Sequence, residues 1–508
     1  MTRDKGVEEG ATLGGRFTLP DGRQILGDLT IAGSKTSLYL HDEAFFGIGY
    51  EQNANLVGLL HDRTNVTILD ASVRSPFGSV SGTGGSYHFA EVLPAFILSG
   101  QHHFDARTSS VASIRFHADD AEEIFYDFDA MGMVIDPRPL IEQVTAANAH
   151  WIQREIRTGP EPQILYFAGR TEIASVETAL GHVRIFHDPH SSGPLSSPRF
   201  VAVRNRVLVE ISFPDAVTFH EALDRLMAIR RLLGLLAGRP QNIDSVRIET
   251  SGDGAHRLLD VYWTRPPRRE PLWEDGRPHA AEILVSAVQD PQEFATVLER
   301  WVAADRDRLE ARVRLASCFD QQSHFTIDRL VGAANMFDIL PASVFRETPP
   351  LVPAVADAKR QARQIFRSLP DSSERDSILN ALGRLSRPTL RNKVRQRAAL
   401  VSTALQAPLT DLDLVTDEAV KCRNHYVHGS PGSFAYAEHP AMTVFLTSAL
   451  EFLFAAADLL DAGWDIARWR AHGSVLAHPF NRVLIEWDQL AGRLRALREP
   501  APTSGSGS

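Results

Sequence analysis

Cysteine is nearly missing from this 508-residue chain, which contains only Cys318 and Cys422. Two cysteines cannot build the disulfide framework of a small secreted domain, and they are too few for a structural zinc site. The sequence therefore predicts a protein of the reducing cytoplasm. Cys422 precedes Arg423 and has the position of a possible nucleophile, although a small buried side chain is the more common role of such a residue.

Long apolar runs are also scarce. The N-terminus is charged and glycine-rich, without the apolar stretch of a signal peptide. The most apolar segment, 444–460, contains Thr447, Ser448, Glu451 and Asp458, so it is expected to be too polar and too short for a membrane span. It is predicted to be a core helix, and no membrane association is expected.

Several catalytic signatures are missing. The chain has no Walker loop, kinase signature, metalloprotease motif or nucleophile triad. The histidines at 102–103 and 187–190 lack carboxylate or cysteine partners at metal-ligand spacing, so neither a metal nor a cofactor is predicted. The glycine cluster at 82–85 is interpreted as a hairpin turn, because the strand–helix context of a phosphate loop is missing.

Acidic residues are missing between 377 and 410, although the chain carries a net charge of −10. This stretch is instead basic and ends in a predicted helix with Arg391, Lys393, Arg395 and Arg397. Such a local island could track the phosphates of RNA, and we assign these four residues to RNA binding. A solvated helix face is the alternative.

The length predicts two or three domains. Residues 14–285 are expected to form a β-rich region, sandwich-like or a sheet module, with two subdomains that divide near 136. Its β-prone runs are 25–31, 37–41, 66–73, 88–98, 113–117, 164–167, 207–213, 246–249 and 259–263, and 219–236 has the periodicity of a helix.

From about 290 to 500 the pattern is helical, which makes the fold class α+β. Helices are predicted over 291–314, 325–340, 353–368, 375–385, 389–405, 416–428, 441–460 and 482–498, with prolines as breakers between several of them. The terminal residues 501–508, which are rich in serine and glycine, are predicted to form a flexible tail.

The run Arg423-Asn424-His425-Tyr426-Val427-His428-Gly429 combines a permanent cation, a carboxamide and a titratable imidazole. Asn424 and His428 are four apart, so a helix places them on one face, where the amide can orient the ring. Arg423 is expected to point to a different side. Gly429 is predicted to end the helix in the left-handed conformation. Arginine neutralises phosphate oxygens and histidine moves protons near neutral pH, a combination that suits phosphodiester chemistry.

Residues 417–429 resemble the signature helix of HEPN domains, in which an arginine and a polar residue are followed by a histidine. The N-terminal runs 15–20 and 27–31 resemble the opening of ApeA-type anti-phage proteins. The resemblance implies a β-rich sensor of a phage-derived trigger, followed by an all-α HEPN bundle. It further implies a ribonuclease that halts translation by cutting host RNA, with transfer RNA as the best candidate.

In this scheme Arg423 binds the phosphate, Asn424 orients His428 or a phosphate oxygen, and His428 transfers protons. One such set per chain is too small for two proton transfers and charge stabilisation, so we expect a homodimer with a composite site. Two alternatives stay open. One is a HEPN-like module that binds RNA or nucleotide without cutting, and the other is a protein- or glycan-binding β-rich half with a bundle that only dimerises.

Overall fold

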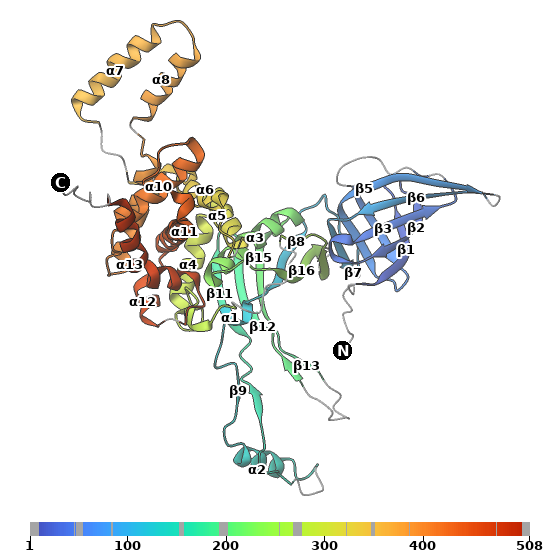
Figure 1. The fold of residues 1–508 in the computed structure, drawn as a ribbon. Coiled ribbons are helices and arrows are strands. Elements are labelled where there is room, and N and C mark those ends of the chain that lie inside the picture. The colour runs from blue at the N-terminus through green and yellow to red at the C-terminus, as the bar shows by residue number, and fades with distance from the viewer. Residues whose placement is uncertain are drawn as a thin grey trace. The chain divides into compact units, whose positions relative to one another are not determined.

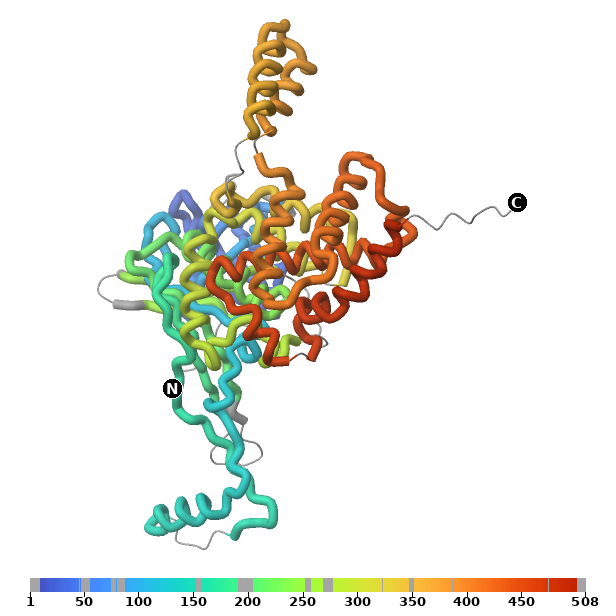
Figure 2. The backbone as a smooth tube through the Cα atoms, turned by 90° about the vertical axis from the view of Figure 1, so that its left-hand side faces the viewer, coloured from blue at the N-terminus to red at the C-terminus, as the bar shows by residue number. Residues whose placement is uncertain are grey.

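A computed structural model describes residues 10–44, 46, 54–82, 85–151, 157–192, 202–252, 255–267, 277–321, 323–346, 351–385, 387–473 and 475–499. The chain divides into two compact units: residues 1–237 with 241–302 form unit 1, and residues 238–240 with 303–508 form unit 2. The predicted fold class is confirmed, because the strands lie in unit 1 and the described elements of unit 2 are helical (Figure 1, Figure 2).

The first six strands of unit 1 close into a barrel. They pair in the order β5-β4-β1-β2-β3-β6, and β6 pairs again with β5. Closure leaves none of these strands as a bare edge, where a sandwich would have left several. Residues alternate between the inside and outside, and Phe17, Ile25 and Leu38 are among the core side chains. The strands are β1 (Thr12–Thr18), β2 (Gln24–Thr30), β3 (Ser37–Asp42), β4 (Ala54–Leu60), β5 (Asn65–Gly82) and β6 (Gly85–Leu93).

The same sheet continues from β5 into the second half of unit 1. Helix α3 (Phe219–Ala237) packs against β8 and β15 through a buried apolar face that includes Leu226 and Ile229. The further strands, in spatial order from β5, are β7 (Phe96–Gly100), β17 (Ala255–Trp263), β16 (Ile243–Gly252), β8 (Val111–Ala118), β15 (Val207–Val217), β12 (Gly181–His187) and β11 (Glu172–Thr178).

The run predicted as one strand over 88–98 is two strands, β6 and β7, with Pro94 between them. Proline has no N–H to give to a sheet ladder, which favours a break at this point. Pairing of β5 with β6 runs as far as Gly82 opposite Gly85, as a hairpin requires.

The smaller elements of unit 1 are α1 (Ala121–Ile124), α2 (Arg138–Ala147), α4 (Pro291–Ala303) and the short pairs β9 (Met131–Met133) with β10 (Leu165–Phe167) and β13 (His190–Ser192) with β14 (Ala202–Arg204).

A nearly buried histidine ties α1 to the sheet. His117 Nδ1 lies 3.2 Å from Asp244 Oδ2, and its Nε2 lies 3.1 Å from Glu122 Oε1. Burial by itself lowers the pKa of His117, but the hydrogen bonds to these two carboxylates outweigh burial and raise the pKa to about 9. The ring is therefore charged at neutral pH and holds two acidic side chains in place.

Unit 2 is a bundle of helices. The single helix predicted over 291–314 is in fact two, α4 and α5, and acidic residues in the first turn of α5 favour a new helix start there. Helices α7 and α8 pack on each other, and neither contains a buried residue. The helices are α5 (Asp305–Asp320), α6 (Ile327–Ile339), α7 (Pro353–Arg367), α8 (Ser373–Arg384), α9 (Leu390–Ala404), α10 (Leu412–His428), α11 (Pro440–Ala462), α12 (Ile466–Ala471) and α13 (Pro479–Arg498).

Helix α11 is the centre of this bundle. It has 23 residues, so the expectation that this segment is too short for a membrane span was wrong, and within the described residues it alone is long and apolar enough to cross one. However, 78% of its most apolar window is buried inside the protein. This burial is what the predicted core helix requires, with side chains such as Phe452 and Leu453 fully enclosed.

Acidic residues of α11 are compensated by arginines from neighbouring helices. Arg312 Nε lies 2.9 Å from Asp458 Oδ2, and Arg329 Nε lies 2.7 Å from Glu451 Oε1. All four side chains are buried. Loss of one partner of such a pair typically costs about 3–5 kcal/mol, because an uncompensated charge stays behind. These pairs fix the register of α5 and α6 on α11.

Candidate active site

The motif predicted from sequence occupies the last turns of α10. Val415, Ala419 and Cys422 face the bundle core, which turns the end of the helix with His428 toward solvent. Gly429 ends the helix with a φ of 67°, and its N–H donates to the carbonyl of His425 at 2.9 Å. The glycine cap predicted from the sequence is therefore confirmed.

The guanidinium of Arg423 connects the polar side chains of the motif. Its Nη1 donates to Asn424 Oδ1 at 3.0 Å and to His428 Nε2 at 3.1 Å. The expectation that Arg423 points away from the other two was wrong, because its long side chain turns along the helix end. The amide and the imidazole thus meet through the arginine, with the cation between them.

This arrangement defines the state of the imidazole. Arginine has only donors, so Nε2 of His428 accepts and the proton of the neutral ring lies on Nδ1. His428 is exposed, and Arg423 and Asn424 are partly buried. A phosphodiester approaching from solvent would therefore meet the imidazole and the guanidinium together. The Nε of Arg423 is buried and has no hydrogen-bond partner within the described residues, so the contact with a phosphate would come from its Nη atoms.

A fourth residue, Asn335 of α6, completes the arrangement. Its Oδ1 accepts from Nη2 of Arg423 at 3.0 Å, across 88 positions of sequence. Sequence reasoning missed this residue. The available signal was a carboxamide between Ala334 and Met336, which are both buried, and such a polar residue on an inward helix face needs a partner.

The segment after the motif is fixed to α10 by hydrogen bonds. His425 Nδ1 lies 2.8 Å from the carbonyl of Ser430. The fully buried carboxylate of Glu418 accepts from Ser433 Oγ at 2.8 Å and from Tyr436 Oη at 2.5 Å. Burial and this carboxylate raise the pKa of Tyr436, so the phenol stays a donor. These hydrogen bonds hold the segment 430–436 in place against the end of α10.

Cys422 is fully buried in the bundle. Burial first and the nearby charge of Glu418 second raise the pKa of its thiol to about 12. The nucleophile is the thiolate, and this thiol stays protonated at neutral pH. The interpretation as a small buried side chain fits this geometry.

The predicted RNA-binding residues of α9 all have carboxylate partners. Arg391 and Arg395 both pair with Asp417 of α10, the latter with Nε 2.8 Å from Oδ1. Partial burial works to raise the pKa of Asp417, and the two guanidinium groups outweigh it and lower the pKa. Arg391 is nevertheless 55% exposed at its side chain, so it is the member of the set that solvent reaches most readily.

The other two members are less accessible. Lys393 Nζ lies 2.9 Å from Asp338 Oδ1, and Arg397 Nη2 lies 2.8 Å from Asp461 Oδ2. Arg397 is buried, with 5% of its surface exposed, so phosphate oxygens cannot reach it in this conformation. Its role here is to join α9 to α11. Among the described residues no group of three or more histidine, cysteine, aspartate or glutamate side chains could hold a metal ion.

Two family models match the chain. Residues 13–301 match ApeA N-terminal domain 1, and residues 331–467 match the Apea-like HEPN domain. No curated protein and no solved structure gives a match. The HEPN match includes most of α6 and all of α9 and α10, and hence both Asn335 and the residues from Arg423 to His428. The chain therefore belongs to the ApeA family, with its β-rich N-terminal domain followed by a HEPN domain.

Proposed function

We propose that this protein is a metal-independent endoribonuclease of anti-phage defence. The observation that carries the proposal is the contact between Arg423 and His428 at an exposed helix end, with the cation braced by Asn335 and Asn424. The family, an anti-phage family with a HEPN nuclease-type domain, supports the same reaction class.

RNA supplies its own nucleophile. The 2′-hydroxyl attacks the adjacent phosphorus, its proton goes to a base, and the 5′-oxygen leaves after it accepts a proton. The products are a 2′,3′-cyclic phosphate and a 5′-hydroxyl. Once a phosphate oxygen replaces His428 as the partner of Arg423 Nη1, the lone pair of His428 Nε2 is released to act as the base, and Arg423 stabilises the dianionic phosphorane. Each positioned proton-transfer group typically contributes about 10²–10⁴-fold.

The leaving oxygen needs a second proton-transfer group. One chain offers one exposed imidazole in the motif, so we assign the second to a second copy of the chain. A two-fold axis beside the end of α10 would bring two arginines and two histidines to one phosphate. Splayed, single-stranded RNA allows the in-line attack, and the loops of transfer RNA provide such strands.

The first test is cleavage of total transfer RNA by the purified chain with a metal chelator present. His428→Ala and Arg423→Ala should each abolish discrete fragments, and His472→Ala, a change of an exposed histidine at the end of α12, should cut at the wild-type rate. Binding of RNA without fragments by the wild type would instead favour the non-catalytic alternative. Cleavage by His428→Ala at the wild-type rate would remove this residue from the mechanism.

The composite site has its own test. Co-expression of wild-type and His428→Ala chains in equal amounts gives mixed dimers. If one site needs both histidines, activity falls to about a quarter of wild type, whereas independent sites leave about half. A linear loss of activity with the wild-type fraction would therefore contradict a composite site, even if the chain is a ribonuclease.

In the cell we propose that the enzyme acts in the cytoplasm and is activated when the N-terminal domain senses a phage-derived trigger. Sequencing of RNA ends in infected and uninfected cells would test both steps. New 5′-hydroxyl ends should accumulate only after infection and only with an intact His428. Equal cleavage without phage would exclude control by a trigger.

A further inference from the structure

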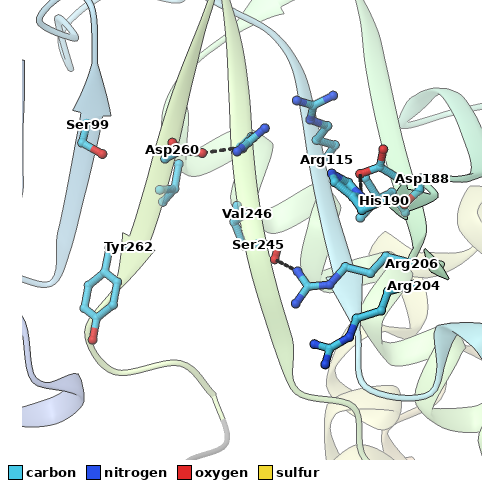
Figure 3. A pocket seen from close by; sticks show the side chains of 13 residues that line it. Ser99, Arg115, Asp188, His190, Arg204, Arg206, Ser245, Val246, Asp260 and Tyr262 are labelled. Atoms are coloured by element: carbon cyan, nitrogen blue, oxygen red, sulfur yellow. Dashed lines mark hydrogen bonds and ion pairs between the residues drawn. The ribbon is translucent and has the colours of Figure 1, made fainter. Parts of the chain in front are cut away.

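A pocket of about 510 Å³ opens on one face of the unit 1 sheet, far along the chain from the HEPN motif (Figure 3). Arginines from three strands and from the residues before β15 contribute to its lining: Arg115, Arg204, Arg206 and Arg247. Only two carboxylates, Asp188 and Asp260, accompany them. The lining therefore has more arginines than carboxylates, in a chain whose net charge is −10, and a local excess of positive charge favours anions.

The strand register explains why this charge is not neutralised from within. Arg247 of β16 lies directly opposite Arg115 of β8 on one side and opposite Asp260 of β17 on the other. The guanidinium of Arg247 pairs with Asp260. Arg115 lies opposite Arg247 on one side and opposite Glu210 of β15 on the other. Glu210 pairs with Arg184 at 3.0 Å, and the side chain of Arg115 makes no ion pair or hydrogen bond within the described residues. Like charges directly opposite each other on neighbouring strands destabilise a sheet. An anion bound between Arg115 and Arg247 would attract both guanidinium groups and so stabilise this part of the sheet.

Two further arginines, Arg204 and Arg206, also line the pocket. Arg206 Nη1 donates to Ser245 Oγ at 2.6 Å and lies 3.8 Å from Asp244 Oδ1, whereas Arg204 has no carboxylate partner within the described part of the chain. Figure 3 shows both side chains reaching toward β16. Ser245 has a positive φ of 51° and lies at a shift in the register of β16 with β8. Bulges of this kind re-aim side chains next to binding sites.

The remaining wall is apolar. Val246 and Val261 are buried, and Tyr262 is partly buried at the β17 side of the pocket. The phenol oxygen of Tyr262 accepts from the N–H of Gly33 at 2.8 Å, which fixes its ring. A fixed aromatic ring and two valines offer a surface for the body of a ligand, whereas the arginines offer donors for its charged end.

We propose that this pocket binds a small molecule that carries two or more phosphate groups on an aromatic body, the class of the nucleoside di- and triphosphates. One guanidinium group can donate two hydrogen bonds to a phosphate, and one phosphate has enough oxygens to accept from two arginines at once. A carboxylate has only two oxygens and satisfies fewer of these donors. The volume lies within the range of about 300–1,000 Å³ that is typical of small-molecule sites. The proposal is independent of ribonuclease activity, because its residues all belong to unit 1.

Isothermal titration of the full chain with ATP, GTP, inorganic pyrophosphate and citrate tests the proposal. A nucleoside triphosphate should bind most tightly, pyrophosphate more weakly because it lacks the body, and citrate least. Arg115→Gln and Arg204→Gln should each weaken binding by about ten- to a hundredfold, the range for loss of a charge-assisted hydrogen bond. Arg107→Gln, a change in an exposed loop of the same unit, should leave the affinity unchanged.

A stability measurement separates ligand binding from a structural role. Without ligand, the side chain of Arg115 makes no ion pair or hydrogen bond within the described residues and has one like and one opposite charge beside it, so Arg115→Gln should hardly change the melting temperature. With ATP, the wild type should gain more thermal stability than the variant. The proposal fails if none of the probes binds at millimolar concentration, if both pocket variants bind as the wild type does, or if citrate binds as tightly as the nucleotides. Loss of stability by Arg115→Gln without ligand would equally overturn it.

Discussion

Replacement of Asn335 by alanine tests how the candidate active site is built. This side chain contacts neither of the proposed proton-transfer groups, and its only assigned task is to hold Nη2 of Arg423 at 3.0 Å. Without it, the guanidinium keeps its contacts through Nη1 but loses the contact that opposes rotation about the end of the side chain. Asn335 is thus a positioning residue for Arg423.

The size of the effect follows from the hydrogen bond. A bond to a charged group is typically worth about 1.5–3 kcal/mol. Arg423 is only partly buried, so water replaces the amide in part and the lower end of this range applies. Since about 1.4 kcal/mol corresponds to a factor of ten, Asn335→Ala should lower kcat by about tenfold. KM should change less, because the guanidinium group of Arg423 stays close to its original position and can still bind the phosphate.

The assay is cleavage of a labelled transfer RNA over a range of substrate concentrations. Asn392→Ala removes an exposed carboxamide from α9 and is the matched control, with unchanged kcat expected. Asn335→Asp keeps an acceptor at the same place, so it should fold normally and keep the arginine oriented, but its charge should raise KM by competing with phosphate. The reasoning would be refuted if Asn335→Ala cut at the wild-type rate while His428→Ala were inactive.

Further predictions concern charges elsewhere in the chain. Asp417→Asn removes the shared counter-charge of two α9 arginines, so its RNA affinity should rise in a His428→Ala background, as measured by fluorescence anisotropy; unchanged affinity would exclude α9 from RNA binding. The pKa of His117 is raised from 6.5 to about 9, so its stabilising charge is fully present below pH 6.5 and is lost as the pH rises through 9. His117→Gln should therefore destabilise the protein by up to about 3 kcal/mol at pH 6 and hardly at all above pH 10, as chemical unfolding would show. Cys318 and Cys422, whose pKa values burial raises to about 12, should react with a thiol reagent only after unfolding, and rapid native labelling would contradict their buried positions.

The sequence was sufficient for features that depend on neighbours in the chain. The helix end at Gly429 follows from glycine's freedom to adopt a positive φ, and the α+β order follows from a change in hydrophobic period near residue 290. The barrel did not follow from the sequence, because its closure depends on β5 pairing with both β4 and β6. A strand's alternation tells which face is buried but not which strands lie beside it.

The side-chain directions at the candidate site could not be predicted for a related reason. Asn335 meets Arg423 because α6 and α10 pack together, and no local pattern records this contact. How far the charge of the basic run on α9 is compensated also depends on contacts that the local sequence does not record. Its partners Asp338, Asp417 and Asp461 come from three different helices, so the segment is cationic in sequence and largely paired in space.

The arginines of α9 and those of the unit 1 pocket therefore differ from what the sequence suggests about their availability for phosphate. Those on α9 are close in sequence, and each has a carboxylate partner. Arg115, Arg204 and Arg247 are scattered over more than a hundred positions, and the sheet brings them to one pocket, where only Arg247 of the three pairs with a carboxylate, Asp260, within the described residues. Affinity for a phosphate depends on donors that are left available after folding. By this criterion an anion binds first at the unit 1 pocket, and the α9 surface competes only where Asp417 is displaced.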